Sequence, residues 1–136
     1  MYESGGLEIL DEHECRELLG ATPLGRVVFT DRALPAIQPV NFALCHGDVV
    51  IRTSAGSKLA AATRNAVVAF EVDEFDSAIC DGWSVVIIGH ARVISEEKEL
   101  ACLRRLPLRG CPSDEHDYYI AITPELISGR RVSKTA

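Results

Sequence analysis

The longest strand that the sequence predicts, residues 82–95 with the sequence GWSVVIIGHARVIS, has the alternation that a β-strand requires. Because every second side chain of a strand lies on the same face, Val85, Ile87 and Ala91 would share one face and His90 would lie on the other. Further β-rich runs occur at residues 25–30, 36–44, 49–53, 66–72, 118–123 and 126–132. These runs do not alternate regularly with helices, which disfavours a parallel doubly wound sheet. The pattern predicts a mainly β protein with peripheral helices (α+β), folded as an antiparallel barrel of six to seven strands.

Three short helices are expected around these strands. Residues 11–19 begin with Asp11 as N-cap and Glu14 in the capping-box position. Residues 58–65 and 96–106 are the other two, the last capped by Ser95.

Two prolines and two loops divide the predicted strands. Pro39 interrupts the second run, which indicates a sheet edge, a bulge or a ligand there, since proline donates no ladder hydrogen bond. Pro124 separates the last two runs, and residues 73–81 and 107–117 are expected to be loops. We expect one domain over residues 1–136, with residues 1–10 a flexible N-terminus.

Charge and cysteine content limit the function classes. The net charge of −6 disfavours general affinity for nucleic acid or anionic membranes, and no apolar run approaches a membrane span. The five cysteines are odd in number and form no C-x-x-C pair, and the N-terminus does not resemble a signal peptide. We therefore expect reduced thiols, a cytoplasmic protein and no metal site.

The segment 49–64, VVIRTSAGSKLAAATR, has the composition of a phosphate-binding turn. Arg52 and Lys58 enclose three hydroxyl residues, among them Thr53 and Ser57, where a strand leads into a helix. Unpaired N–H groups at a helix start favour phosphate, and the two cations strengthen that preference. The alternative is a structural turn in which Ser57 is an ordinary N-cap.

The order of GRVVFT, QPVNFAL, VVIRTSAGSKLAA, VAFEVDEFD and GWSVVIIGHA resembles the pyridoxamine 5'-phosphate oxidase-like family of flavin-binding split β-barrels. The resemblance covers roughly residues 18–132. It implies a homodimer that holds FMN in clefts at the subunit interface.

The same resemblance assigns roles to individual residues. It implies that Arg52, Thr53, Ser57 and Lys58 hold the FMN phosphate. It also implies that Pro39, Val40 and Asn41 run beside the isoalloxazine ring, and that Trp83, from the partner subunit or the cleft wall, covers part of the cofactor. The pair Arg130 and Arg131 is a weaker candidate for the cleft.

Several other residues also have a structural interpretation that involves no ligand or catalysis. Trp83 could simply pack in the core, and His90 is interpreted as a hydrogen-bonded core or interface histidine. His116, in an acidic loop, is expected to be solvated, and so is the acidic cluster Glu71, Asp73, Glu74 and Asp76. No nucleophile with a supporting base is evident, so no catalytic residue is predicted.

The expected activity is that of an FMN-dependent oxidoreductase acting on a small organic acceptor such as a quinone or nitro compound. A reductase that uses a deazaflavin coenzyme, and a non-catalytic module that binds flavin or haem, are the alternatives. The chain shows no second phosphate site rich in Arg and His, so the family name is not interpreted as its activity.

Overall fold

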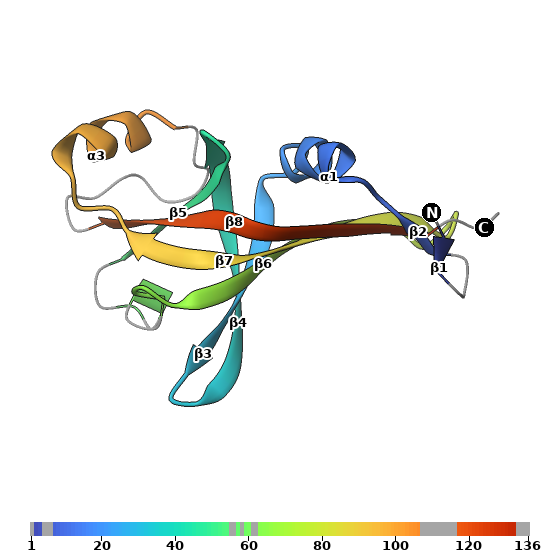
Figure 1. Cartoon of the computed structure of the whole chain (residues 1–136), viewed down its shortest axis with the longest axis horizontal. Coiled ribbons are helices and arrows are strands. Elements are labelled where there is room, and N and C mark those ends of the chain that lie inside the picture. The colour runs from blue at the N-terminus through green and yellow to red at the C-terminus, as the bar shows by residue number, and fades with distance from the viewer. Residues whose placement is uncertain are drawn as a thin grey trace.

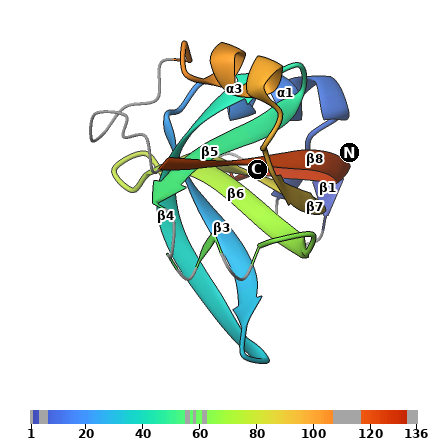
Figure 2. The same cartoon turned by 90° about the vertical axis from the view of Figure 1, so that its left-hand side faces the viewer.

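Six strands form a closed antiparallel ring in the computed structural model, which describes residues 2–3, 7–54, 57, 59–60, 63–106 and 117–132. The ring runs in the order β8-β5-β4-β3-β6-β7, and pairing of β7 with β8 closes it (Figures 1 and 2). Its members are β3 (Leu24–Asp31), β4 (Leu34–Cys45), β5 (Asp48–Ser54), β6 (Val67–Asp76), β7 (Asp81–Val93) and β8 (Asp117–Val132). The predicted fold class is therefore confirmed.

Two short strands extend the sheet beyond the ring. β2 (Leu7–Ile9) pairs with residues 130–132 of β8, and β1 (Tyr2–Glu3) pairs with β2. Part of the segment that we expected to be flexible is thus paired with the end of the longest strand.

Helices α1 (Glu12–Leu19) and α3 (Glu97–Leu103) lie on the same side of β8 in Figure 1. The predicted cap of α1 is confirmed, because the Asp11 side chain accepts a hydrogen bond from the Glu14 N–H at 2.9 Å. The predicted cap of α3 is wrong: the N-cap is Glu96 and makes no side-chain cap bond. Glu97 and Glu99 in its first turn are instead placed favourably for the helix dipole.

Alternation along the strands separates the barrel interior from its outer face. Val27, Phe70 and Ile87 point inward and are fully buried. Phe42 and Phe70 pack edge to face, with ring centroids 4.8 Å apart. On β7, the residues that we assigned to the inner face are buried, and His90 on the other face is exposed.

Two-residue turns close the first two hairpins. His46 and Gly47 both have positive φ, as do Arg32 and Ala33, which is the geometry that matches the right-handed twist of paired strands. The His46-Gly47 turn lies between the strands that the sequence predicts at residues 36–44 and 49–53.

The acidic segment 73–81 and Pro124 differ from the predictions. β6 continues to Asp76 and pairs there with Asp81, so only the short turn between them is loop. β8 is one continuous strand, because a register shift accommodates Pro124: Ile88 pairs with Leu126, whereas Gly89 pairs with Pro124. Glu125 is the extra residue of this β-bulge.

Candidate functional site

The outer edge of β4 is open where the predicted ring-binding residues lie. β3 pairs with residues 34–41 of β4, but β5 pairs only with residues 42–45. Pro39 and Asn41 therefore have β3 on one side and no described strand on the other. The interruption that we expected at Pro39 is a sheet edge, which is where a proline costs no ladder hydrogen bond.

The end of β5 brings Arg52 beside this edge. The last pair between β4 and β5 joins Phe42 to Ile51, so Asn41 and Arg52 are the next residues on the two strands. Both are half-buried, and alternation places both on the outer face. Val40, between the two edge residues, points into the core and is 8% exposed. The Val40 side chain is thus not available at the edge.

The turn after β5 is closed by hydroxyl groups. Thr53 Oγ1 and Ser57 Oγ are 3.0 Å apart, and Ser57 Oγ accepts a hydrogen bond from the Ala60 N–H at 3.0 Å. Ser57 is thus the N-cap of the short helical turn that follows. Thr53 and Ser57 are thus in contact, Arg52 precedes Thr53 on β5, and Lys58 lies outside the described residues. The phosphate-binding role of these residues stays a prediction.

Trp83 lies at the other end of the barrel. It packs against the chain's own core and pairs with Glu74 and Arg131. Val93, at the end of β7, is next to the β8 residues that pair with Arg52. Trp83 precedes Val93 by ten residues, which corresponds to about 33 Å of extended strand. One chain therefore does not bring Trp83, Arg130 or Arg131 to the turn at Arg52.

A charged cluster that the sequence analysis missed lies beside Pro39. Arg26 pairs with Pro39 across β3 and β4, and its Nη1 is 3.1 Å from both Glu71 Oε1 and Asp73 Oδ2. Burial, together with the neighbouring Asp73, raises the pKa of Glu71, while Arg26 opposes that rise. The acidic cluster is thus partly an ion-pair network, and the pairing register that forms it is not visible in the sequence. The described residues contain no group of side chains suited to hold a metal ion.

His90 is on the outer face rather than in the core. Its side chain is 59% exposed and pairs through Nδ1 with Glu125 of the β-bulge. This histidine lowers the pKa of Glu125, chiefly by hydrogen bonding to its carboxylate. His116 lies outside the described residues.

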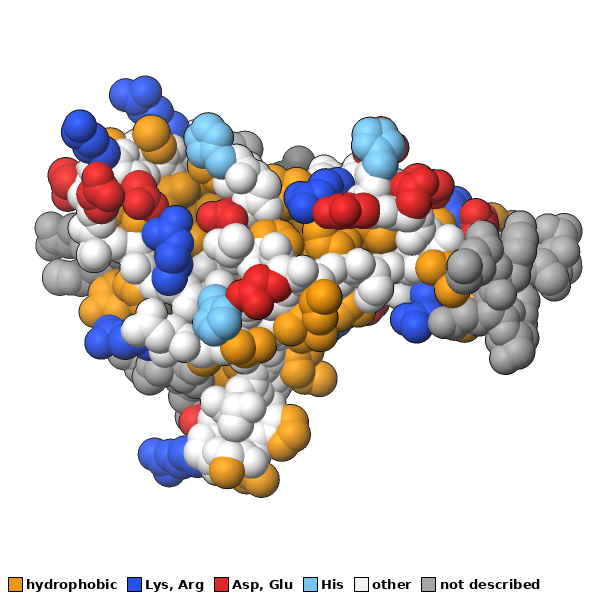
Figure 3. Space-filling model, viewed as in Figure 1, with side chains coloured by type: hydrophobic (Ala, Val, Ile, Leu, Met, Phe, Trp, Pro, Cys, Tyr) orange, Lys and Arg blue, Asp and Glu red, His pale blue; other side chains and the backbone are white. Residues whose placement is uncertain are grey.

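An apolar row crosses the outer face next to Pro39. Cross-strand pairing aligns one residue from each of five strands: Ile37, Val28, Ala69, Ile88 and Leu126. Ile37 is 67% exposed and Leu126 is 65% exposed, although both are large hydrophobic residues. Figure 3 shows hydrophobic side chains on this face from the middle of the molecule down to the projecting end of the β3–β4 hairpin. Exposed apolar surface of this extent is typical of an interaction face.

Comparison with solved structures places this barrel among known relatives. The FAD-binding protein from Mycobacterium smegmatis is 36% identical, with a TM-score of 0.80, and the alignment covers 92% of this chain and 97% of that one. A putative pyridoxamine 5'-phosphate oxidase from Corynebacterium glutamicum is 35% identical with a TM-score of 0.82, over 93% and 98% of the two chains.

Sequence comparison agrees with the structural match. An uncharacterized protein of Mycobacterium tuberculosis is 40% identical over 90% of this chain and 84% of its own length. The pyridoxamine 5'-phosphate oxidase family matches residues 11–131. The closed antiparallel ring and these matches together show that the chain belongs to the pyridoxamine 5'-phosphate oxidase family.

Proposed function

We propose that the protein is a homodimeric flavin-binding oxidoreductase that holds FMN between the turn after β5 and the open edge of β4. The observation that carries this proposal is that Arg52 and Thr53 lie directly beside Pro39 and Asn41, where β4 has no described strand on its outer side. A phosphate site and a backbone edge free to bind a ring are thus adjacent.

The donor groups at the turn suit a phosphate monoester. Arg52 supplies a guanidinium whose planar fork matches phosphate oxygens, and Thr53 and Ser57 supply hydroxyls held 3.0 Å apart. Lys58 would add a second cation next to Ser57 in the sequence. Together these groups offset the desolvation of a doubly charged group, which a single cation seldom does.

The open edge of β4 suits the polar side of the isoalloxazine ring. Backbone groups of residues 39–41 that have no described strand neighbour would bond the ring, and Asn41 is the β4 residue next to Arg52 in the register of the two strands. FMN itself would supply hydride or electron transfer to a small organic acceptor. Backbone N–H donors at this edge would stabilise negative charge on the bound ring, while binding of the phosphate at the neighbouring turn would fix the orientation of FMN.

A second copy of the chain would complete this site. The apolar row ends at Ile37, two residues before Pro39 on the same outer face of β4, so a subunit packed on the row would border the open edge. Since Trp83 lies too far along its own chain, only the second subunit could bring a tryptophan there. Arg131, its pairing partner, would accompany it.

The identity of the flavin is the finer part of the proposal. The Mycobacterium smegmatis relative is described as FAD-binding, so FAD is a second candidate beside FMN, and a deazaflavin coenzyme is a third.

The four described cysteines are free thiols, which suits the proposed cytoplasmic location. No helix among the described residues is long and apolar enough to cross a membrane.

The proposal is tested by titrating the protein with FMN and with riboflavin, which differs only in lacking the phosphate. Loss of the charge-assisted bonds at the turn should make riboflavin bind about 100-fold more weakly than FMN. Parallel titrations with FAD and with a deazaflavin coenzyme rank the other candidates. Equal affinity for FMN and riboflavin would overturn the phosphate assignment, and no binding of any of these compounds would overturn the proposed function.

A further inference from the structure

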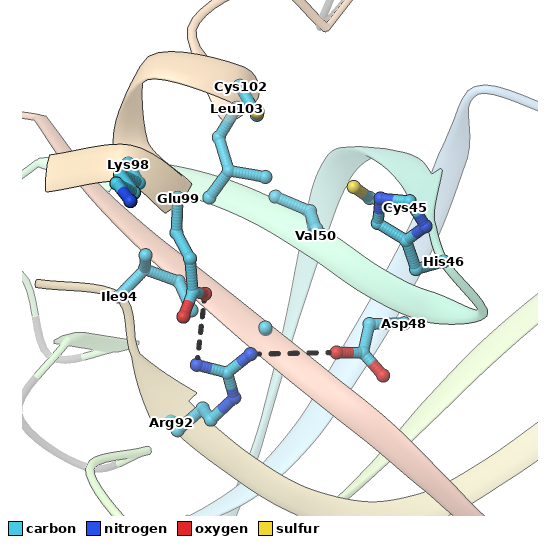
Figure 4. Close-up of a pocket in the computed structure, with 11 residues that line it drawn as sticks. Cys45, His46, Asp48, Val50, Arg92, Ile94, Lys98, Glu99, Cys102 and Leu103 are labelled. Atoms are coloured by element: carbon cyan, nitrogen blue, oxygen red, sulfur yellow. Dashed lines mark hydrogen bonds and ion pairs between the residues drawn. The ribbon is translucent and has the colours of Figure 1, made fainter. Parts of the chain in front are cut away.

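A cavity of about 390 Å³ lies beneath α3, between the helix and the outer face of the barrel. Its walls come from the β4–β5 hairpin, the end of β7, the middle of β8 and α3 itself (Figure 4). None of the residues assigned to the proposed flavin site lines it. Its volume falls within the range of about 300–1,000 Å³ that is usual for small-molecule pockets.

The floor of the cavity is apolar and fixed in position. Val50, Leu103 and Ala121 come from β5, α3 and β8, Ile94 directly follows β7, and each of the four is at most 5% exposed. They belong to a second hydrophobic cluster, separate from the barrel core, that also contains Tyr119. Because these side chains pack against one another across elements, the floor needs no rearrangement to receive a ligand.

The rim carries two cations, Arg92 and Lys98, and two carboxylates, Asp48 and Glu99, so its formal charges cancel. Arg92 Nη1 is 3.2 Å from Glu99 Oε2, and Arg92 Nη2 is 3.8 Å from Asp48 Oδ2 (Figure 4). One guanidinium thus bridges the β4–β5 hairpin and α3. A ligand of either charge would meet a like charge at this rim, whereas a neutral ligand would leave both ion pairs intact and gain contact with the apolar floor.

We propose that this cavity is a binding site for a neutral, largely apolar small molecule of the size of one or two aromatic rings. The site is independent of the proposed flavin site, so either could exist without the other. Cys45 on β4 and Cys102 on α3 both line the cavity, and Cys45 is half-buried there. Its thiol therefore offers a direct reporter of whether the cavity is occupied.

The test measures how fast Cys45 is modified by N-ethylmaleimide, resolved peptide by peptide by mass spectrometry, in the presence of 1-naphthol. At about ten times its Kd, 1-naphthol should leave about one tenth of the cavities open and slow the modification of Cys45 about tenfold. Cys80, exposed in the β6–β7 turn outside the cavity, should react at an unchanged rate and serves as the internal control. Naphthalene-1-carboxylate, the anionic counterpart, should protect Cys45 much less.

Two variants distinguish binding of 1-naphthol in the cavity from a general effect of 1-naphthol on cysteine reactivity. Ala121→Leu fills part of the cavity and should reduce protection by 1-naphthol, while Ala78→Leu, in the exposed β6–β7 turn, should not. If Ala121→Leu does not fold, Leu103→Phe at the opposite wall makes the same comparison. Three results would overturn the proposal. They are a lack of Cys45 protection up to the solubility limit of 1-naphthol, equal protection of Cys45 and Cys80, and equal protection of Cys45 by 1-naphthol and by naphthalene-1-carboxylate.

Discussion

Individual residues of the phosphate turn have two functions that need not compete. Ser57 caps the helical turn and also contacts Thr53, so the ordinary N-cap interpretation and the phosphate interpretation describe the same hydroxyl. The cap bond uses Ser57 Oγ as an acceptor, which leaves the hydroxyl hydrogen to donate. Ser57 can therefore accept a hydrogen bond from the helical turn and donate one to Thr53 or to an anion, which is consistent with both interpretations.

Replacing the cations of this turn should remove the preference for phosphate while leaving the fold intact. Arg52→Ala combined with Lys58→Ala should weaken FMN binding by about 100-fold or more and bring its affinity close to that of riboflavin. Arg105→Ala, an exposed arginine just after α3, is the matched control and should bind FMN as the wild type does. A double variant that retains wild-type affinity for FMN would show that the phosphate lies elsewhere.

The His90–Glu125 pair should give stability a measurable pH dependence. Because the pKa of Glu125 is lowered in the folded protein, its carboxylate stabilises the fold above the ordinary glutamate pKa of about 4.3, and this contribution disappears as the pH falls through the lowered value. Chemical denaturation of wild type and Glu125→Gln between about pH 3 and pH 7 measures it. The difference in free energy of unfolding should be small, because the pair is exposed, and should vanish at the acidic end. A difference that persists unchanged at the lowest pH would contradict this assignment.

At the scale of secondary-structure elements, the sequence predicts what is local and misses what depends on pairing. Asp11 with Glu14 fixes the start of α1 through contacts within four residues, so the prediction was correct. Pro124 indicates a break, yet its effect depends on β7, where Gly89 lets the two strands approach and a bulge absorbs the proline. Arg26 reaches Glu71 only because the register of β3 and β6 places them opposite each other, which no local pattern specifies.

The bulge in β8 should depend on glycine at position 89. A Cβ atom there would lie 1.9 Å from the Thr123 carbonyl oxygen, too close unless the backbone shifts. Gly89→Ala should lower the free energy of unfolding by about 1–3 kcal/mol, as overpacking typically does. Gly20→Ala is the matched control, since the nearest atom to its Cβ would be 3.6 Å away and φ is −78°. Equal stability of Gly89→Ala and wild type in urea denaturation would show that the strands can separate at little cost.

At the scale of the whole molecule, the proposed site would be completed by the proposed dimer. The barrel leaves an apolar row uncovered beside the open edge of β4, while its tryptophan lies at the opposite end of the same chain. Both features are explained if two barrels pack through this face. The sequence suggested the dimer only through its family resemblance, because the row is assembled from five strands and no single segment displays it.

A charge placed in the apolar row should therefore dissociate the dimer. Leu126→Asp should convert a particle of twice the 14.8 kDa chain mass into monomers, because a buried unpaired carboxylate is costly. Ile79→Asp, an equally apolar and exposed site in the β6–β7 turn, should leave the dimer intact. Sedimentation velocity distinguishes the two. A monomeric wild type, or a Leu126→Asp variant that remains dimeric, would rule out this face as the interface.

The most direct test of the central claim is the near-ultraviolet and visible absorption spectrum of the purified protein, recorded before and after incubation with FMN and gel filtration. We predict oxidised-flavin bands that co-elute with the protein at one equivalent per chain. A spectrum that remains featureless after FMN has been added and the excess removed would contradict the account.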